Sequence, residues 1–179
     1  KGAAKAVLFY YSFGTQTVKM DRSPTKTSVD LDKLAALGKY MTSVPVPNTS
    51  GQFYVAYQVA NMKVRVLQVD AEAAATKEVI NKWDFGGPGT SFTSFGHNLD
   101  SRVNSAGKLQ LAYYIDKYPK VIVSTLDNPK LNVWKDEYPR GTATMPTIKV
   151  ASEGRVEFSG GQMVFGDHDG TDYSISLWD

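Results

Sequence analysis

The sequence contains no cysteine, and its charges nearly balance. Without cysteine there is no disulfide, no thiolate zinc ligand and no cysteine nucleophile. Twenty lysines and arginines against eighteen aspartates and glutamates leave a formal charge of +2, and the basic residues are scattered along the chain. That pattern argues against nucleic acid as a partner. No apolar run approaches the roughly 20 residues that a membrane-spanning helix needs, so no membrane span is expected.

Recognisable catalytic motifs are also scarce. The chain has two histidines, and Ser94, His97 and Asp100 lack the Gly-x-Ser-x-Gly context that exposes a serine nucleophile. Acid pairs for glycoside hydrolysis must face each other across a cleft, and candidates such as Asp136 and Glu137 are explained more simply as surface charge. The sequence therefore favours a protein that is not an enzyme, without deciding the matter.

What the sequence does contain is a repeat. Four segments begin with glycine, run through an apolar or aromatic strand, a polar turn and a second alternating strand, and end in aspartate. They span residues 2–21, 51–70, 107–127 and 161–179. A period of about 50 residues built on β-hairpins is typical of propeller blades. The physical reason is that a lone hairpin cannot bury its apolar face, whereas stacked blades bury one another's.

The segments between these units are expected to form the remaining secondary structure. Residues 23–41 carry Leu31, Leu34 and Leu37 at helical spacing and Gly38 as a stop, which predicts a short helix. Residues 70–83 are expected to form either another helical turn or an outer strand over residues 76–83, and residues 131–134 a strand. We therefore expect an all-β chain with at most one or two short helices. It would form a single domain over residues 1–179 that can also be a fragment of a larger protein.

The second and third units agree most closely with each other. They share Gly51, Ala56-Tyr57, Val64, Val66 and Trp83 in one, and Gly107, Ala112-Tyr113, Val121, Val123 and Trp134 in the other. This pattern resembles the blades of sialidase-like and lectin-like β-propellers, and the resemblance implies four hairpin-centred blades. The sialidase Asp-box (Ser-x-Asp-x-Gly-x-Thr-Trp) is missing. A β-sandwich or jelly roll, in which the same hairpins are adjacent strand pairs, is the alternative.

One segment has the composition of a metal site. In FGDHDGTD (165–172), the carboxylates of Asp167, Asp169 and Asp172 lie close together around a glycine. Calcium takes six to eight oxygen ligands, and clustered aspartates supply several of them. The simpler interpretation is a hairpin tip, because Asp-Gly is a strong turn signal. Calcium is therefore the one cofactor that the sequence suggests, and both interpretations stay open.

Aromatic and amide side chains are frequent near expected strand ends. An aromatic face can pack against the C–H side of a sugar ring while amides or carboxylates bind its hydroxyl groups. The candidate ligand-binding residues are Trp83, Tyr118, Asn132, Trp134 and Tyr138. Each of them could equally be a core residue whose polar tip is satisfied.

The leading functional expectation is non-catalytic, lectin-like carbohydrate binding at shallow repeated sites. Its partners would be glycans or glycoproteins, and multivalency would strengthen weak single sites. The first alternative is a protein-interaction or structural module of a larger assembly. The second is a propeller-type carbohydrate-active enzyme. The start without methionine suggests a processed or excised chain, and a secreted protein or a homo-oligomer would agree with the composition.

Overall fold

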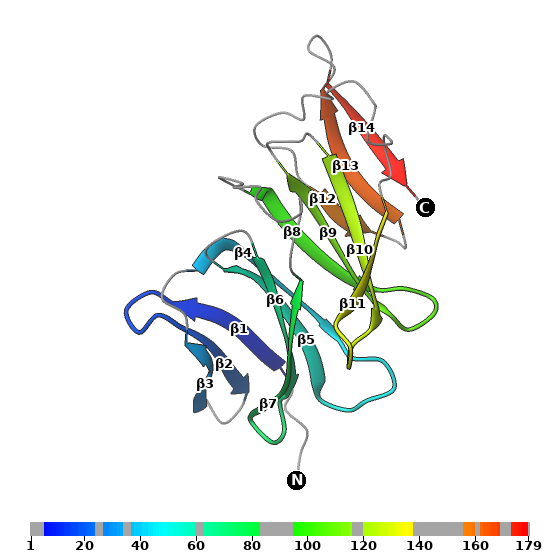
Figure 1. Cartoon of the computed structure of the whole chain (residues 1–179). Helices are drawn as coiled ribbons and strands as arrows, with labels where there is room; N and C mark the ends of the chain where they lie inside the picture. The colour runs from blue at the N-terminus through cyan, green and yellow to red at the C-terminus, as the bar shows by residue number, and fades with distance from the viewer. Residues whose placement is uncertain are drawn as a thin grey trace. The chain divides into compact units, whose positions relative to one another are not determined.

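All the regular structure described for this chain is β-strand. The computed structural model describes residues 6–23, 27–33, 37–59, 63–82, 95–115, 120–137, 156–159, 162–168 and 173–178 (Figure 1). Within these ranges no helix has the length and apolarity to cross a membrane. The expectation of an all-β chain is confirmed. The chain divides into two compact units, residues 1–83 and 84–179, and each is described by itself.

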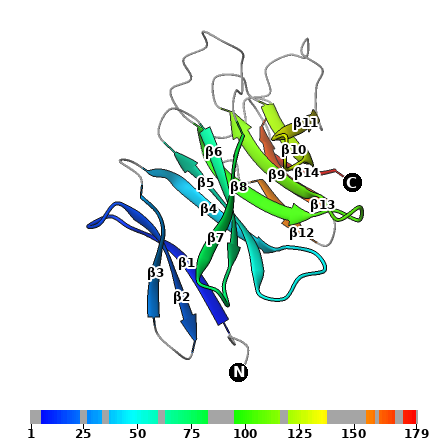
Figure 2. The ribbon, with the colours of Figure 1, turned by 60° about the horizontal axis from the view of Figure 1, so that its bottom comes forward.

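The first unit contains two antiparallel sheets whose strands follow one another in sequence order. One sheet consists of β1 (Ala6–Ser12), β2 (Thr17–Ser23) and β3 (Thr27–Lys33). The other consists of β4 (Leu37–Pro45), β5 (Gln52–Val59), β6 (Lys63–Asp70) and β7 (Ala75–Lys82). Figure 2 shows these four strands side by side.

The second unit is built in the same way. Its four-stranded sheet consists of β8 (Phe95–Val103), β9 (Leu109–Ile115), β10 (Lys120–Asn128) and β11 (Val133–Glu137). Its three-stranded sheet consists of β12 (Val156–Ser159), β13 (Gln162–His168) and β14 (Tyr173–Trp178). The described strand pairs are antiparallel throughout.

Each unit of the sequence repeat forms an antiparallel hairpin. The four hairpins are β1–β2, β5–β6, β9–β10 and β13–β14. The structure also explains the glycine that begins the repeat, because Gly51 and Gly107 have φ of 69° and 76°. A side chain in this left-handed region costs roughly 1–2 kcal/mol, and glycine avoids that cost. Gly2 and Gly161 lie outside the described residues.

The helix expected over residues 23–41 is wrong. The described residues of that segment form β3 and the start of β4. Val29 and Leu31, two positions apart, both pack against the core of the first unit. Burial therefore follows the period of a strand, and this tertiary contact outweighs the spacing of Leu31 and Leu37. Of the two alternatives open for residues 70–83, a helical turn and an outer strand, the structure has the strand, β7, and the strand expected at 131–134 begins at Val133 instead.

The core of the first unit lies between its two sheets. Val18 and Met20 of β2 are fully buried, as are Val55, Leu67 and Val69 of β5 and β6. The central strands β5 and β6 also bury their opposite face, where Ala56, Gln58, Val64 and Val66 lie. Burial on both faces explains why these strands read as nearly continuous apolar runs in the sequence.

A carboxylate joins the two sheets of the first unit. Asp32 Oδ2, on β3, accepts hydrogen bonds from Tyr57 Oη at 2.6 Å and from Arg65 at 2.7 Å, both on the other sheet. Burial and the bond to Asp32 raise the pKa of Tyr57 above its usual value, so the phenol keeps its proton and its role as a donor. A second link runs from Arg22 on β2, which donates to the carbonyls of Ala71 and Glu72.

The second unit is joined by a different set of residues. Ala112 and Val123 pack on Val156 and Met163 to form the apolar contact between its sheets. Asp100 Oδ2, on β8, accepts from the Phe158 backbone amide at 2.7 Å. The Arg102 guanidinium lies 4.4 Å from the centre of the Phe158 ring, a cation–π arrangement.

The repeat tyrosines provide a matched test of the carboxylate link. Tyr57 donates to the charged Asp32, whereas the equivalent Tyr113 shares a bond with the neutral Ser124 hydroxyl. Tyr57→Phe should lower the free energy of unfolding by about 2 kcal/mol and Tyr113→Phe by about 1 kcal/mol, because hydrogen bonds to charged groups are stronger. Urea denaturation measures both. A larger loss for Tyr113→Phe would contradict this account.

The repeat glycines provide a second test. A Cβ added at Gly107 or at Gly14 would meet no atom within 4 Å, but only Gly107 has positive φ. Gly107→Ala should therefore cost about 1 kcal/mol through the backbone alone, and Gly14→Ala should cost nothing or stabilise slightly. Equal effects of the two substitutions on the denaturation midpoint would show that backbone strain is not the cause.

Candidate functional site

The most distinctive exposed feature of the described residues is the turn that joins β10 to β11. It comprises four residues, 129–132, between the two strands. Asn128 Oδ1 accepts from the Leu131 amide at 3.2 Å, and the Asn132 amide donates to the Pro129 carbonyl at 3.2 Å. Asn132 closes the turn with φ of 53°, a left-handed conformation that asparagine tolerates better than most residues. Turn chemistry therefore explains Asn128, Pro129 and Asn132.

Two of the candidate ligand-binding residues meet at this turn. Trp134 Nε1 donates to Asn132 Oδ1 at 2.9 Å. Their sequence neighbours Leu131 and Val133 are 72% and 45% exposed, and Val133 projects from the opposite side of β11 to Trp134 because successive strand residues alternate. We refer to residues 131–134 as the β10–β11 tip. The tip combines apolar surface with an oriented polar pair.

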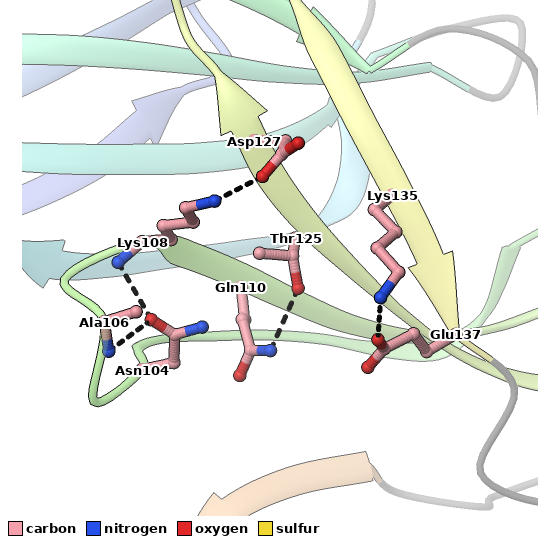
Figure 3. A network of polar contacts seen from close by, with 8 residues as sticks. All are labelled: Asn104, Ala106, Lys108, Gln110, Thr125, Asp127, Lys135 and Glu137. Carbon is pink, nitrogen blue, oxygen red and sulfur yellow. Dashed lines mark hydrogen bonds and ion pairs between the residues drawn. The ribbon is translucent and has the colours of Figure 1, made fainter.

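Two ion pairs lie on the strands β9, β10 and β11 or next to them (Figure 3). Lys108, which follows the β8–β9 turn, forms an ion pair with Asp127 near the end of β10. Lys135 Nζ lies 2.9 Å from Glu137 Oε1 on β11. Asn104 Oδ1 accepts from the amides of Ala106 and Lys108, which fixes the turn that presents Lys108. Both signs of charge are thus present on this sheet, on the face opposite Trp134, because Trp134 and Lys135 are consecutive residues of β11.

These contacts shift the pKa values of Asp127 and Lys135. The hydrogen bond from Lys108, and then its charge, hold the pKa of Asp127 below the usual value. Lys135 adds a further Coulombic contribution in the same direction. The bond to Glu137 raises the pKa of Lys135. At neutral pH Asp127 and Lys135 are therefore both charged.

Beneath this surface a buried polar network stiffens the sheet. Tyr113 Oη and Ser124 Oγ lie 2.6 Å apart, and Ser124 Oγ donates to Asp136 Oδ1 at 2.6 Å. Ser124 is fully buried. A serine without solvent access cannot attack a substrate, so this Tyr–Ser–Asp arrangement joins β9, β10 and β11 rather than forming a catalytic site.

The same turn backbone occurs in the first unit with a different surface. The turn at 71–74 also has four residues, and Ala74 closes it with φ of 54°. Asp70 Oδ1 caps it by accepting from the amides of Glu72 and Ala73. Its sequence, Ala-Glu-Ala-Ala, carries no aromatic or amide side chain. The surface chemistry of the tip is therefore not repeated at the equivalent turn between β6 and β7.

The aspartate that ends each repeat does not have one constant role. Asp70 caps its turn, but in the second unit Asn128 takes that part, and Asp127 pairs with Lys108 instead. The cause is a shift of register between Leu126 and Asn128, which moves the strand end by one residue. The aspartate thus recurs in the sequence repeat, but its structural role differs between the two units.

The other candidate residues are only partly placed. Trp83, Tyr118, Tyr138, Asp169 and Asp172 lie outside the described residues. Asp167 lies in β13, where it is paired in register with Ser174. Among the residues that are described, no group of three or more His, Asp or Glu side chains is arranged to hold a metal. The calcium interpretation therefore stays a prediction. The exposure of Leu131 and Val133 had no signal in the sequence, because both lie in an ordinary strand pattern.

Comparison with known proteins gives only remote likenesses. No family model matches the chain, and no curated protein matches it either. Among solved structures, the chain is similar to the propeller of Dos1, with a TM-score of 0.47 and 14% identity over 97% of this chain and 39% of that one. It is also similar to a luciferin-regenerating enzyme, with a TM-score of 0.45 and 13% identity over 94% of this chain and 56% of the other. The chain thus spans less than two thirds of either protein, and likenesses this remote say nothing about ligand or activity.

The ion pair of Asp127 gives a testable pH dependence. Because its folded-state pKa is depressed, any stability from the Lys108 pair is present above the unfolded pKa of about 4 and is lost as the pH falls through the folded value. Titration of the Asp127 carboxyl carbon by NMR should show this low pKa, and Lys108→Gln should return it towards 4. Lys135→Gln should have a smaller effect. An unchanged pKa in Lys108→Gln would contradict the assignment.

Proposed function

We propose that this chain belongs to a β-propeller-like protein, with each of its four sheets as one blade, and that it acts by binding carbohydrate at the β10–β11 tip. The observation that carries the proposal is the hydrogen bond between Trp134 and Asn132 on an exposed turn. The blade interpretation draws support from four antiparallel sheets of three or four strands in sequence order, which is how propeller blades are built.

The paired indole and amide suit a sugar for a physical reason. The bond from Trp134 Nε1 restrains the ring before any ligand arrives, so less side-chain entropy is lost on binding. A restrained indole can accept the apolar side of a pyranose, and an amide beside it can bind hydroxyl groups. The left-handed backbone of Asn132 holds that amide at the surface.

The charged side chains on the neighbouring strands are not part of the proposed site. Lys108 pairs with Asp127 and Lys135 with Glu137, and Lys135 and Glu137 alternate with Trp134 along β11, so they lie on the opposite face of the sheet from the indole. One exposed turn offers a small contact area, so a single site would bind weakly. Useful affinity would then come from several copies or several sites acting together.

Protein recognition is the second candidate, and one observation favours it. Leu131 and Val133 expose 72% and 45% of their surface at the tip. Exposed apolar side chains at one turn form a surface of the kind that a protein partner covers. A projecting module of a larger assembly would use the tip in this manner.

A glycan array with three variants tests the leading proposal. The wild-type chain should bind a set of chemically related glycans, and Trp134→Ala should weaken that binding about tenfold or more through loss of the aromatic contact. Asn132→Gly removes the amide but keeps a residue that accepts positive φ, so it should weaken binding without loosening the turn. Leu131→Ser should leave glycan binding nearly unchanged.

The controls separate the possible results. Repeating the array with a chelator tests calcium at Asp167, Asp169 and Asp172, because only a calcium-dependent site would lose its signal. A blank array for a folded wild-type chain would exclude carbohydrate binding of this kind. Loss of binding in Leu131→Ser equal to that in Trp134→Ala would instead favour an apolar, protein-type contact.

A further inference from the structure

The loop between β4 and β5, residues 46–51, carries the tripeptide Asn48-Thr49-Ser50 (cyan in Figure 2). Asn-x-Ser/Thr, with any residue except proline in the middle, is the acceptor sequence for N-linked glycosylation. Of the seven asparagines in the chain, only Asn48 has serine or threonine two residues later. The sequence therefore offers one acceptor for this modification, and the structure shows how accessible that acceptor is.

The tripeptide lies at the surface with its two essential groups available. All three residues are exposed. The reaction needs the side-chain amide of Asn48, which takes the sugar, and the hydroxyl of Ser50, which completes the acceptor sequence. Within the described part of the chain, neither group takes part in a hydrogen bond. Thr49, whose side chain the acceptor sequence does not specify, donates its hydroxyl to the Val46 carbonyl at 2.8 Å and so helps to hold the loop.

Other asparagines at the described turns have structural roles that Asn48 lacks. Asn104 and Asn128 accept hydrogen bonds from backbone amides through Oδ1, and Asn132 accepts one from an indole. Asn48 has a left-handed backbone with φ of 57°, which asparagine tolerates well. Backbone conformation thus accounts for an asparagine at this position. It does not account for an amide left without a hydrogen bond or for a serine two residues later.

The base of the loop is fixed independently of Asn48. The Val46 amide donates to the Gln52 carbonyl at 2.9 Å, and the Ala71 amide donates to the Gly51 carbonyl at 2.8 Å. Gly51 has φ of 69°, where a residue with a side chain would be strained. These bonds lie on either side of Asn48, and none of them involves its side chain. A sugar attached to Asn48 would therefore replace no contact that the fold uses.

We propose that Asn48 is an N-glycosylation site. The co-substrate is an oligosaccharide linked through a diphosphate to a lipid, and an oligosaccharyltransferase joins it to the chain. A bond forms between Asn48 Nδ2 and C1 of the first sugar while the bond from C1 to the diphosphate oxygen breaks. The lipid diphosphate leaves with the bonding electron pair, and Nδ2 gives one proton to a base of the transferase. No oxidant or reductant takes part.

The proposal applies to a chain that enters the secretory pathway, where this modification is made. An N-linked glycan is bulky and solubilising, so it would shield the loop between β4 and β5 from other macromolecules. The glycan at Asn48 would be a covalent product, whereas a glycan at the β10–β11 tip would be a ligand. The inference does not depend on carbohydrate binding, and the two proposals can fail separately.

Expression in cultured eukaryotic cells tests the proposal. The chain is given an added N-terminal signal peptide, whose removal shows that the chain has entered the endoplasmic reticulum. The wild-type chain should then carry one glycan, and peptide N-glycosidase should release it from the denatured chain and convert Asn48 to aspartate. Mass spectrometry of the intact chain and of its peptides measures both changes. Asn48→Gln and Ser50→Ala should each abolish the glycan.

Thr49→Ala is the matched control for Ser50→Ala. Both substitutions remove one hydroxyl from the same exposed loop, but Thr49→Ala leaves the asparagine and the serine of the acceptor sequence in place. It should therefore keep the glycan. Circular dichroism of the purified chains establishes that each variant is folded.

Three results would overturn the proposal. The first is a wild-type chain that loses its signal peptide but carries no glycan. The second is a glycan that persists in Asn48→Gln, because the sugar would then be attached elsewhere. The third is loss of the glycan in Thr49→Ala as well as in Ser50→Ala, which would show that removal of any loop hydroxyl has this effect and that the acceptor sequence is not the cause.

Discussion

The hydrogen bonds at Asp32 constrain the whole first unit. Two sheets can bury apolar faces against each other in several registers, because apolar contact is not directional. A carboxylate that must meet Tyr57 Oη and Arg65 from the opposite sheet admits only one of these arrangements. Removing either the Asp32 carboxylate or one of its donors is also costly, because a polar group near the core would then lack a hydrogen-bond partner. Packing provides the stability, and Asp32 provides the alignment.

In the second unit, other residues hold the two sheets together. Asp100 accepts from the backbone of Phe158, and Arg102 covers the ring of that residue. Its repeat tyrosine, Tyr113, bonds to Ser124 within its own sheet. Equivalent positions of a repeat thus share backbone and burial while their polar partners differ. The same holds at the surface, where two turns of equal length and matching φ carry Ala-Glu-Ala-Ala in one unit and Trp134 with Asn132 in the other.

Several features of the fold could be read from the residues in advance. The four hairpins followed from alternating apolar positions, whereas the segment that forms β7 was compatible with a strand or a helical turn. The helix expected over 23–41 failed because leucine spacing is a local signal, whereas Val29 and Leu31 are buried by a partner sheet that is distant in sequence. For the site, Asn132 and Trp134 stay predicted ligand-binding residues, and the structure adds that they are hydrogen-bonded to each other. Their mutual bond depends on a left-handed residue that no periodicity reveals.

The sequence by itself determined the all-β character, the hairpin repeat and the absence of thiol chemistry, because these depend on composition and on patterns of two to twenty residues. Only the tertiary structure decided which aspartates join sheets, which cap turns and which pair with lysine. It also decided which strands lie at an edge. These roles depend on groups far apart in the chain, such as Asp32 with Tyr57 or Asp100 with Phe158. A pattern of neighbouring residues cannot identify such distant partners.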